Sequence, residues 1–284
     1  MMTPQVISWM NVEQGDPDYD PEADQFDHRL LAEGDSWFSL GGIPTSNLLY
    51  SLRLPHRAIV VNCAKPGDTI RRMGQVAANT DLREAMSHNF GYAWDLILLS
   101  GGGNDLIDDA VDIVRPRSGP AGNPASWCDE ARLLQTLDDV EQGYRRIVAM
   151  RDRADSSCPG VPVVTHTYDW VTPRNAPANF LTVPFFGPWL YTAVLSAGVP
   201  ESMWNPVSDY LLGRLRDALK ALAKGPDRLP NFHVVVTQGT LVRAEMGVTL
   251  ESNDWMNEIH PNYGGYRKLA SKIGRRVRNI LDQD

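Results

Sequence analysis

Five short apolar runs, rich in β-branched and aliphatic residues, alternate along this chain with segments of helical periodicity. The runs cover residues 30–34, 58–61, 96–99, 161–165 and 232–236. Turn-forming residues bound each run, as expected of strands that are buried on both faces. Segments 132–150 and 266–281 repeat apolar residues at helical spacing. Because parallel strands need helical crossovers, the sequence predicts a three-layer α/β/α sandwich around a five-stranded parallel sheet.

The chain of 284 residues is long enough to bury one large core. Aspartates and glutamates cluster with prolines near the start, so we expect an acidic N-terminal arm over residues 1–27 and a single domain over 28–284. Within the domain, segment 168–206 departs from the alternation and interleaves aromatic residues with prolines. Such an insertion forms either a lid or pocket wall, or a layer packed onto the body, and its aromatic residues suit both.

Composition excludes several classes of function. The net charge of -8 argues against nucleic-acid binding, which demands clustered lysines and arginines. Cys63, Cys128 and Cys158 are odd in number and widely spaced, so neither a disulfide framework nor a zinc site is expected, and no cofactor is expected. The N-terminus lacks a signal-peptide pattern and no run matches a membrane span, so we expect a cytoplasmic protein without an integral membrane segment.

Polar motifs stand at four places that the predicted fold brings together. Gly34-Asp35-Ser36 follows the first strand, Gly67 lies after the second, and Asn104 lies after the third. His260 lies in a loop before the C-terminal helix. Because the carboxyl ends of parallel strands meet at one edge of a sheet, we expect these residues to converge on one crevice.

These residue types match the requirements of acyl transfer from an ester. The reaction needs a nucleophile, a base that takes its proton, and donors aimed at the oxygen that becomes negative. Ser36 can attack and His260 can accept its proton. The backbone N–H groups of Ser36 and Gly67 and the side-chain amide of Asn104 can form the oxyanion hole, and Gly67 lets the backbone approach the substrate closely.

In their order and composition, the four motifs resemble those of the SGNH hydrolase family, also called GDSL-like lipases and acylhydrolases. The resemblance extends from Ser36 to the C-terminal helix and leaves segment 168–206 outside its motifs. It implies a flavodoxin-like fold in which Ser36 is the nucleophile, Gly67 and Asn104 are oxyanion donors, and His260 is the base.

One position departs from the family pattern. An aspartate usually stands three residues before the catalytic histidine, and here that residue is Asn257. A neutral amide can hold the imidazole but stabilises the imidazolium less than a carboxylate does. Asp254, in the same loop, is therefore the first candidate to orient His260, with Asn257 or a backbone carbonyl as alternatives. Glu258 is the other nearby acid, and it can instead brace the loop.

Other polar and aromatic residues near the strand ends have expected roles. His166 ends the fourth strand and Trp170 opens the insertion, so we expect both to contact substrate. Asp35 and Asp105 stand in turns, where aspartates commonly accept hydrogen bonds from local backbone N–H groups, so we expect scaffolding roles for them.

The function predicted from these residues is that of a serine esterase or acylhydrolase acting through an acyl-enzyme. The expected partner is a small-molecule ester, either lipid-like or an acylated sugar. Two alternatives use the same fold: an acyltransferase that delivers the acyl group to a sugar or alcohol, and a non-catalytic carbohydrate-binding module.

Overall fold

A computed structural model describes residues 1–39, 46–75, 77–180 and 183–282. Its main sheet has six strands, all parallel, in the order β1-β3-β2-β4-β5-β8. The strands are β1 (Gln5–Ser8), β2 (His28–Gly34), β3 (Ala58–Asn62), β4 (Leu96–Ser100), β5 (Val163–His166) and β8 (Phe232–Val235). The parallel sheet and the flanking helices confirm the predicted fold class.

The sheet has one strand more than the sequence predicted. The additional strand, β1, pairs with β3 at the edge of the sheet, and it lies within the segment that we expected to be an acidic arm. The helix that follows it, α1 (Trp9–Glu13), buries the Trp9 side chain in the core. At least the first half of segment 1–27 is therefore part of the folded domain, and a one-turn 3-10 helix, η1 (Pro17–Tyr19), follows.

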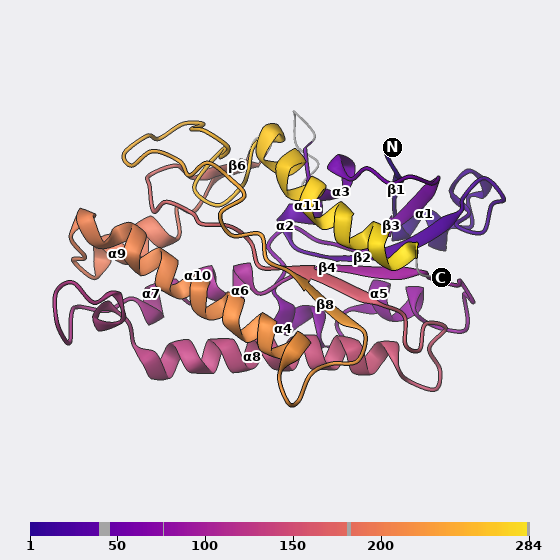
Figure 1. Ribbon diagram of the computed structural model, residues 1–284, viewed down its shortest axis with the longest axis horizontal. Coiled ribbons are helices and arrows are strands. Elements are labelled where there is room, and N and C mark those ends of the chain that lie inside the picture. The colour runs from indigo at the N-terminus through magenta and orange to yellow at the C-terminus, as the bar shows by residue number, and fades with distance from the viewer. Residues whose placement is uncertain (40–45, 76, 181–182, 283–284) are drawn as a thin grey trace.

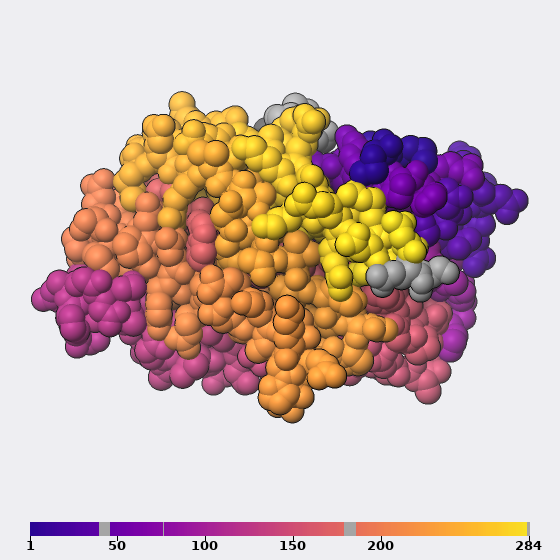
Figure 2. Space-filling view, viewed as in Figure 1, coloured from indigo at the N-terminus to yellow at the C-terminus, as the bar shows by residue number. Residues whose placement is uncertain are grey.

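Helices cover both faces of the sheet. Figure 1 shows α11 (Tyr263–Leu281) above the sheet and α8 (Glu130–Arg151) below it, and α10 (Glu201–Lys224) packs against α8 and β8. Segments from the C-terminal half of the chain occupy most of the face seen in Figure 2. The shorter helices are α2 (Ser36–Ser39), α3 (Leu48–Ser51), α4 (Ile70–Met73), α5 (Thr80–Ala85), α6 (Gly103–Asp108), α7 (Ala110–Ile113), α9 (Leu190–Ser196) and the 3-10 helix η2 (Pro124–Trp127).

Burial explains why the central strands are apolar on both faces. All five residues of β4 are buried, and its four apolar residues expose at most 1% of their surface. The long helices have clear N-terminal boundaries: Asp129 accepts a hydrogen bond from Arg132 N at the start of α8, and Asn262 accepts one from Gly265 N at the start of α11. Such caps satisfy backbone N–H groups that lack an acceptor within the helix.

The insertion after β5 is more regular than its composition suggested. It contains a two-stranded antiparallel hairpin, β6 (Ala178–Phe180) and β7 (Val183–Phe186), then α9, then the first residues of α10. Helix α10 continues through Pro206 without a break. The insertion thus contributes α9 and the start of α10, two helices that contact each other.

The strand order locates the functional edge of the sheet. Without β1, it is the 2-1-3-4-5 order of flavodoxin-like sheets, which bind ligands where the order reverses. Here the reversal falls between β2 and β4. Figure 1 shows α2 and α6, which follow these strands, at the left end of the sheet. Within the described residues, no helix is both long and apolar enough to span a bilayer.

We expect Gly143→Ala to destabilise the fold, because α8 and α4 touch at this glycine. A Cβ atom at Gly143 would lie 2.5 Å from the backbone oxygen of Ile70, which a side-chain rotation cannot relieve. Overpacking of this kind costs about 1–3 kcal/mol, and urea denaturation measures it. Gly213→Ala is the matched control: its Cβ would meet only Arg216 Nη2 at 3.9 Å, so the helix gains roughly 0.5–1 kcal/mol. Equal stability of the Gly143 variant and the parent chain would contradict this tight contact.

Candidate active site

Ser36 begins α2, directly after β2 and the residue Asp35. The Asp35 side chain accepts hydrogen bonds from the Trp37 N–H at 3.0 Å and from the Ser100 hydroxyl at 2.8 Å. It also accepts one from the hydroxyl of Tyr168. Burial raises the pKa of the Asp35 carboxyl to about 6, although these donors oppose that rise. Asp35 thus has the scaffolding contacts that the sequence suggested, and they fix the turn that carries Ser36.

His260 lies next to the serine, although 224 residues separate them in the sequence. Its Nε2 atom is 2.8 Å from Ser36 Oγ. The imidazole is buried, and burial lowers the pKa of His260 to about 4. The histidine is therefore neutral at physiological pH, so it can accept a proton.

Asn257 determines which nitrogen of His260 carries the proton. Its Oδ1 atom accepts hydrogen bonds from the backbone N–H groups of Ile259 (3.1 Å) and His260 (2.8 Å). Two N–H donors require an oxygen at this position, which fixes the orientation of the amide. The same Oδ1 lies 3.1 Å from His260 Nδ1, so Nδ1 must be the protonated nitrogen. His260 Nε2 is then a free acceptor facing Ser36.

Asp254, our first candidate for the orienting group, has other partners. Its carboxylate accepts from Lys268 Nζ at 2.7 and 2.6 Å and from the Val242 N–H at 2.6 Å. The carboxylate oxygens of Asp254 are therefore occupied by the Lys268 ammonium group and a backbone N–H. Among the described contacts, Asn257 and not Asp254 touches the imidazole of His260. The contacts therefore favour Asn257 over Asp254 as the group that orients His260.

Glu258 braces the loop, as its position suggested. One carboxyl oxygen accepts from the Trp189 N–H at 2.5 Å and the other from the Tyr191 N–H at 2.7 Å. Burial raises the pKa of Glu258 to about 7, although these hydrogen bonds oppose that rise. The loop that carries His260 is thereby fastened to the start of α9.

The expected oxyanion donors keep N–H hydrogens that no described residue accepts. Asn104 borders the same cavity as Ser36, and one of its amide hydrogens is donated to the Asp68 carbonyl at 2.8 Å. An amide carries two hydrogens, so one remains for a substrate. Gly67 has a φ of +73°, which favours glycine, and its N–H has no hydrogen-bond acceptor among the described residues. The first N–H groups of a helix, here that of Ser36, have no intrahelical acceptor.

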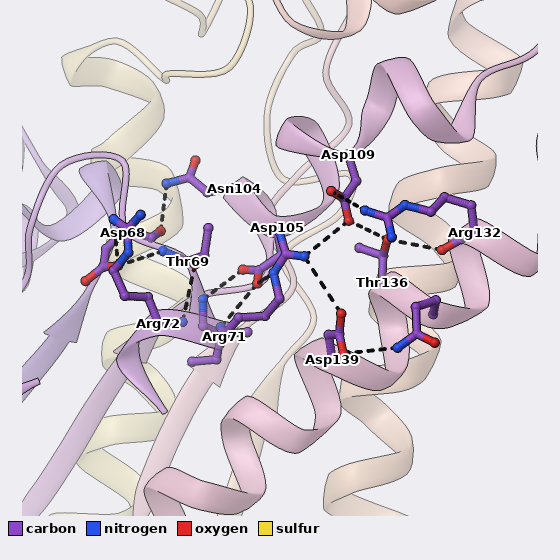
Figure 3. Close-up of polar contacts among 12 residues, drawn as sticks. Asp68, Thr69, Arg71, Arg72, Asn104, Asp105, Asp109, Arg132, Thr136 and Asp139 are labelled. Atoms are coloured by element: carbon purple, nitrogen blue, oxygen red, sulfur yellow. Dashed lines mark hydrogen bonds and ion pairs between the residues drawn. The ribbon is translucent and has the colours of Figure 1, made fainter. Parts of the chain in front are cut away.

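A buried aspartate joins the two loops that carry these donors. Asp105, which follows Asn104, accepts from the Ile70 N–H at 2.8 Å and from the Arg71 N–H at 3.2 Å. Arg71 Nε also donates to it at 3.1 Å. Figure 3 shows this network continuing from Arg71 to Asp109 and Asp139. Asp105 is thus a scaffold, as expected, and it spans two sequence motifs.

The two residues expected to contact substrate, His166 and Trp170, are not among the described residues that line the cavity beside Ser36. The His166 ring is buried, receives the Tyr168 N–H at Nδ1, and lies 3.0 Å from the Ser100 hydroxyl through Nε2. It stacks on Trp37 beneath the serine turn and lines no part of the cavity beside Ser36. The guanidinium of Arg216 lies over the ring of Trp170, with its Cζ atom 6.0 Å from the ring centre. Each of the two rings has a partner within the protein, and their contact with substrate stays a prediction.

The cavity wall beside Ser36 consists of residues that the sequence did not single out. Ile107 of α6, Leu190 of α9 and Leu212 of α10 line it together with the Tyr168 ring. Aliphatic residues on amphipathic helices look like ordinary core, so no sequence signal distinguishes them. Across the described residues, no group of three or more His, Cys, Asp and Glu side chains is arranged to hold a metal ion.

A nucleophilic hydroxyl, a neutral imidazole and amide donors at the edge of a parallel sheet can together activate an acyl carbonyl. A sequence model of the GDSL-like lipase/acylhydrolase family matches residues 33–268. The chain belongs to this family, which places it among the esterase- and lipase-type hydrolases and confirms the resemblance seen in its motifs. No curated protein is similar enough to the sequence to count as a match.

Solved structures with related architecture include two esterase-type enzymes and a transferase. The extracellular lipase of Streptomyces rimosus is 16% identical, with a TM-score of 0.47 over 90% of this chain and 99% of that one. The acetylxylan esterase of Geobacillus stearothermophilus is 14% identical, with a TM-score of 0.48 over 89% and 94%. A salicylyl-acyltransferase from a tetracycline biosynthetic pathway is 14% identical, with a TM-score of 0.45 over 92% and 56%. The family assignment rests on the sequence match.

We expect Asn257→Asp to raise the pKa of His260 from about 4 by about 1–3 units, because a carboxylate beside the ring stabilises the imidazolium. An NMR titration of the histidine ring protons measures the change. Asp254→Asn is the matched control, since Lys268 and Val242 hold that carboxylate. A larger shift from the Asp254 variant than from the Asn257 variant would contradict the assignment of Asn257.

Proposed function

We propose that this protein is a serine esterase that hydrolyses carboxylic esters of small molecules through an acyl-enzyme. The single observation that carries the proposal is the 2.8 Å hydrogen bond between Ser36 Oγ and His260 Nε2. Because the tautomer of His260 leaves Nε2 unprotonated, this hydrogen bond runs from the hydroxyl to the imidazole. A non-catalytic binding module would have no need of a nucleophile paired with a base.

In the first half of the reaction, Ser36 Oγ attacks the ester carbonyl carbon while its proton passes to His260 Nε2. The tetrahedral intermediate then collapses, its bond to the alcohol oxygen breaks, and His260 returns the proton to that oxygen. The acyl group remains on Ser36 as an ester. In the second half, His260 takes a proton from water, hydroxide adds to the carbonyl, and the acid leaves as Ser36 regains its proton.

The negative oxygen formed in both steps needs donors placed in advance. The backbone N–H groups of Ser36 and Gly67 and the second amide hydrogen of Asn104 are the proposed donors. Their loops are held by Asp35 and Asp105, so the donors are ordered before the substrate arrives. Preorganised donors of this kind contribute about two to three orders of magnitude each to turnover.

Burial, with an uncharged Asn257 beside the ring, makes the proposed base weak but available over a wide pH range. The pKa of His260 is about 4, so the imidazole stays neutral in mildly acidic solution. As the pH falls through that value, the imidazole becomes protonated and can no longer accept the Ser36 proton. The acid limb of kcat/KM is therefore expected near pH 4, and Asn257→Asp would move it to higher pH.

We expect Ser36→Ala to abolish hydrolysis of p-nitrophenyl acetate, because the Oγ atom that forms the acyl-enzyme is removed. Circular dichroism should be unchanged, since the Ser36 side chain makes its hydrogen bond to His260 alone among the described side chains. A fluorophosphonate probe should label the parent chain at Ser36 and leave the variant unlabelled. Substantial turnover by the folded variant would overturn the proposed function.

We expect Asp105→Asn to lower kcat for p-nitrophenyl acetate by about tenfold or more while KM changes little, because it disturbs the donors that act on the transition state. An asparagine offers one oxygen and one NH2 group to three N–H donors from Ile70 and Arg71. Asp139→Asn is the control: its carboxylate is one-third exposed and lies 3.8 Å from Arg71. Equal kcat values for the two variants would argue against a positioning role for Asp105.

A further inference from the structure

The cavity beside the proposed nucleophile is small. It measures about 30 Å³ and touches both Ser36 and Asn104. A water molecule needs at least about 10–15 Å³ when cavity space is measured in this way, so the enclosed part of the cavity holds roughly two small groups, and beyond it the cavity opens to solvent. The part of a substrate that this enclosed space surrounds is correspondingly short.

The position of the cavity shows which part of an ester enters it. The departing alcohol oxygen must lie beside His260, because the imidazole gives it a proton. The described lining includes Ser36, the proposed oxyanion donor Asn104 and Ile259, the neighbour of His260, but not His260 itself. The acyl chain, which lies on the other side of the carbonyl carbon, is therefore the part that points into this cavity.

The walls are apolar side chains held by the body of the fold. Leu190 and Leu212 expose only 2% and 4% of their surface, so each is packed on its other sides. Leu212 belongs to the 24-residue helix α10. Leu190 is the first residue of α9, whose start is fastened by the Glu258 carboxyl group to the loop of His260. Enlarging the enclosed part of the cavity at this wall would require the Leu190 or Leu212 side chain, or the helix that carries it, to move.

The part of the wall formed by Gly103 and Tyr168 is also tightly packed. Gly103 and the ring of Tyr168 both line the cavity, and a Cβ atom at Gly103 would lie 2.6 Å from Tyr168 Cζ. Tyr168 has a φ of 59°, which is uncommon for a residue with a side chain, and its hydroxyl donates to Asp35. The ring therefore cannot swing away without breaking that contact. Asp35 is the one acidic group on the lining, and its hydrogen bonds face the scaffold.

We propose that the protein is selective for esters of acetic and propionic acid, with Leu190 and Leu212 setting the limit on acyl length. The inference rests on the proposed function, since it uses Ser36 as the nucleophile. The apolar walls admit an uncharged chain and offer no cation to a dicarboxylic acyl group such as succinyl. The alcohol part lies outside the cavity, so selectivity is expected in the acyl chain and not in the leaving group.

The test is a profile of kcat/KM over p-nitrophenyl esters of two, three, four, six and eight acyl carbons. For the parent chain we expect high values for acetate and propionate and a fall of about tenfold or more from propionate to butyrate, since a single misplaced methylene commonly changes kcat/KM by that factor. The octanoate should be hydrolysed at least about a hundredfold more slowly than the acetate.

Leu212→Ala and Leu190→Ala should each raise the ratio of butyrate to acetate kcat/KM by about tenfold. The ratio does not depend on how much of a variant is folded, so loss of stability cannot mimic this result. Leu219→Ala is the matched control, because Leu219 lies two turns after Leu212 on the same face of α10, is fully buried and does not line the cavity. It should leave the ratio unchanged.

Rapid octanoate hydrolysis by the parent chain, or unchanged ratios in both cavity variants, would overturn the acyl-length inference and leave the esterase function standing. A rise in the ratio for Leu219→Ala equal to that for Leu212→Ala would also overturn it. Failure of the esterase function itself looks different: no ester of the series is hydrolysed and the fluorophosphonate probe does not label Ser36.

Discussion

The side-chain oxygen of Asn257 is the atom on which the rest of the site depends. It accepts two backbone N–H groups and faces the His260 ring nitrogen, so one uncharged atom shapes the loop and selects the tautomer. Only with that tautomer does the hydrogen bond between Ser36 and His260 run in the direction that catalysis requires. An aspartate would add a negative charge that stabilises the imidazolium. The asparagine keeps the geometry without that charge, and buried His260 stays neutral to low pH.

Three buried acids connect the parts of the site, and each works as an acceptor. Asp35, Asp105 and Glu258 expose at most 1% of their surface. A buried acid without donors would be strongly destabilising, and here every one of the three accepts backbone N–H groups. The donors to Asp105 come from the start of α4 and those to Glu258 from the start of α9. These acids therefore hold together segments that are far apart in the sequence.

The sequence predicted the central sheet and the meeting of Ser36 with His260, because burial and parallel topology dictate both. It missed β1, since a four-residue edge strand that is half exposed carries little periodicity. It favoured Asp254 because that residue is close to His260 in the sequence. Sequence proximity does not determine where a side chain points, and in the structure Lys268 of α11 binds the Asp254 carboxylate. The position of His166 near the serine was predicted, but its ring points to Ser100 because a partner that is remote in sequence decides the rotamer.

The sequence left two roles open for the insertion 168–206, a lid or pocket wall and a layer packed onto the body, and the structure combines a pocket wall with packing. Its residues pack onto the body, and Tyr168 and Leu190 also form walls of the cavity beside the serine. The Glu258 carboxyl group accepts hydrogen bonds from the start of α9, and His260 lies two residues after Glu258 in the same loop. The proposed wall of the acyl cavity at α9 is therefore hydrogen-bonded to the loop that carries the proposed base. An outward shift of α9 that admitted a longer acyl chain would pull on that loop. In the proposed function, acyl selectivity and the alignment of the base are therefore coupled through Glu258, and a shorter wall side chain widens the cavity without moving α9.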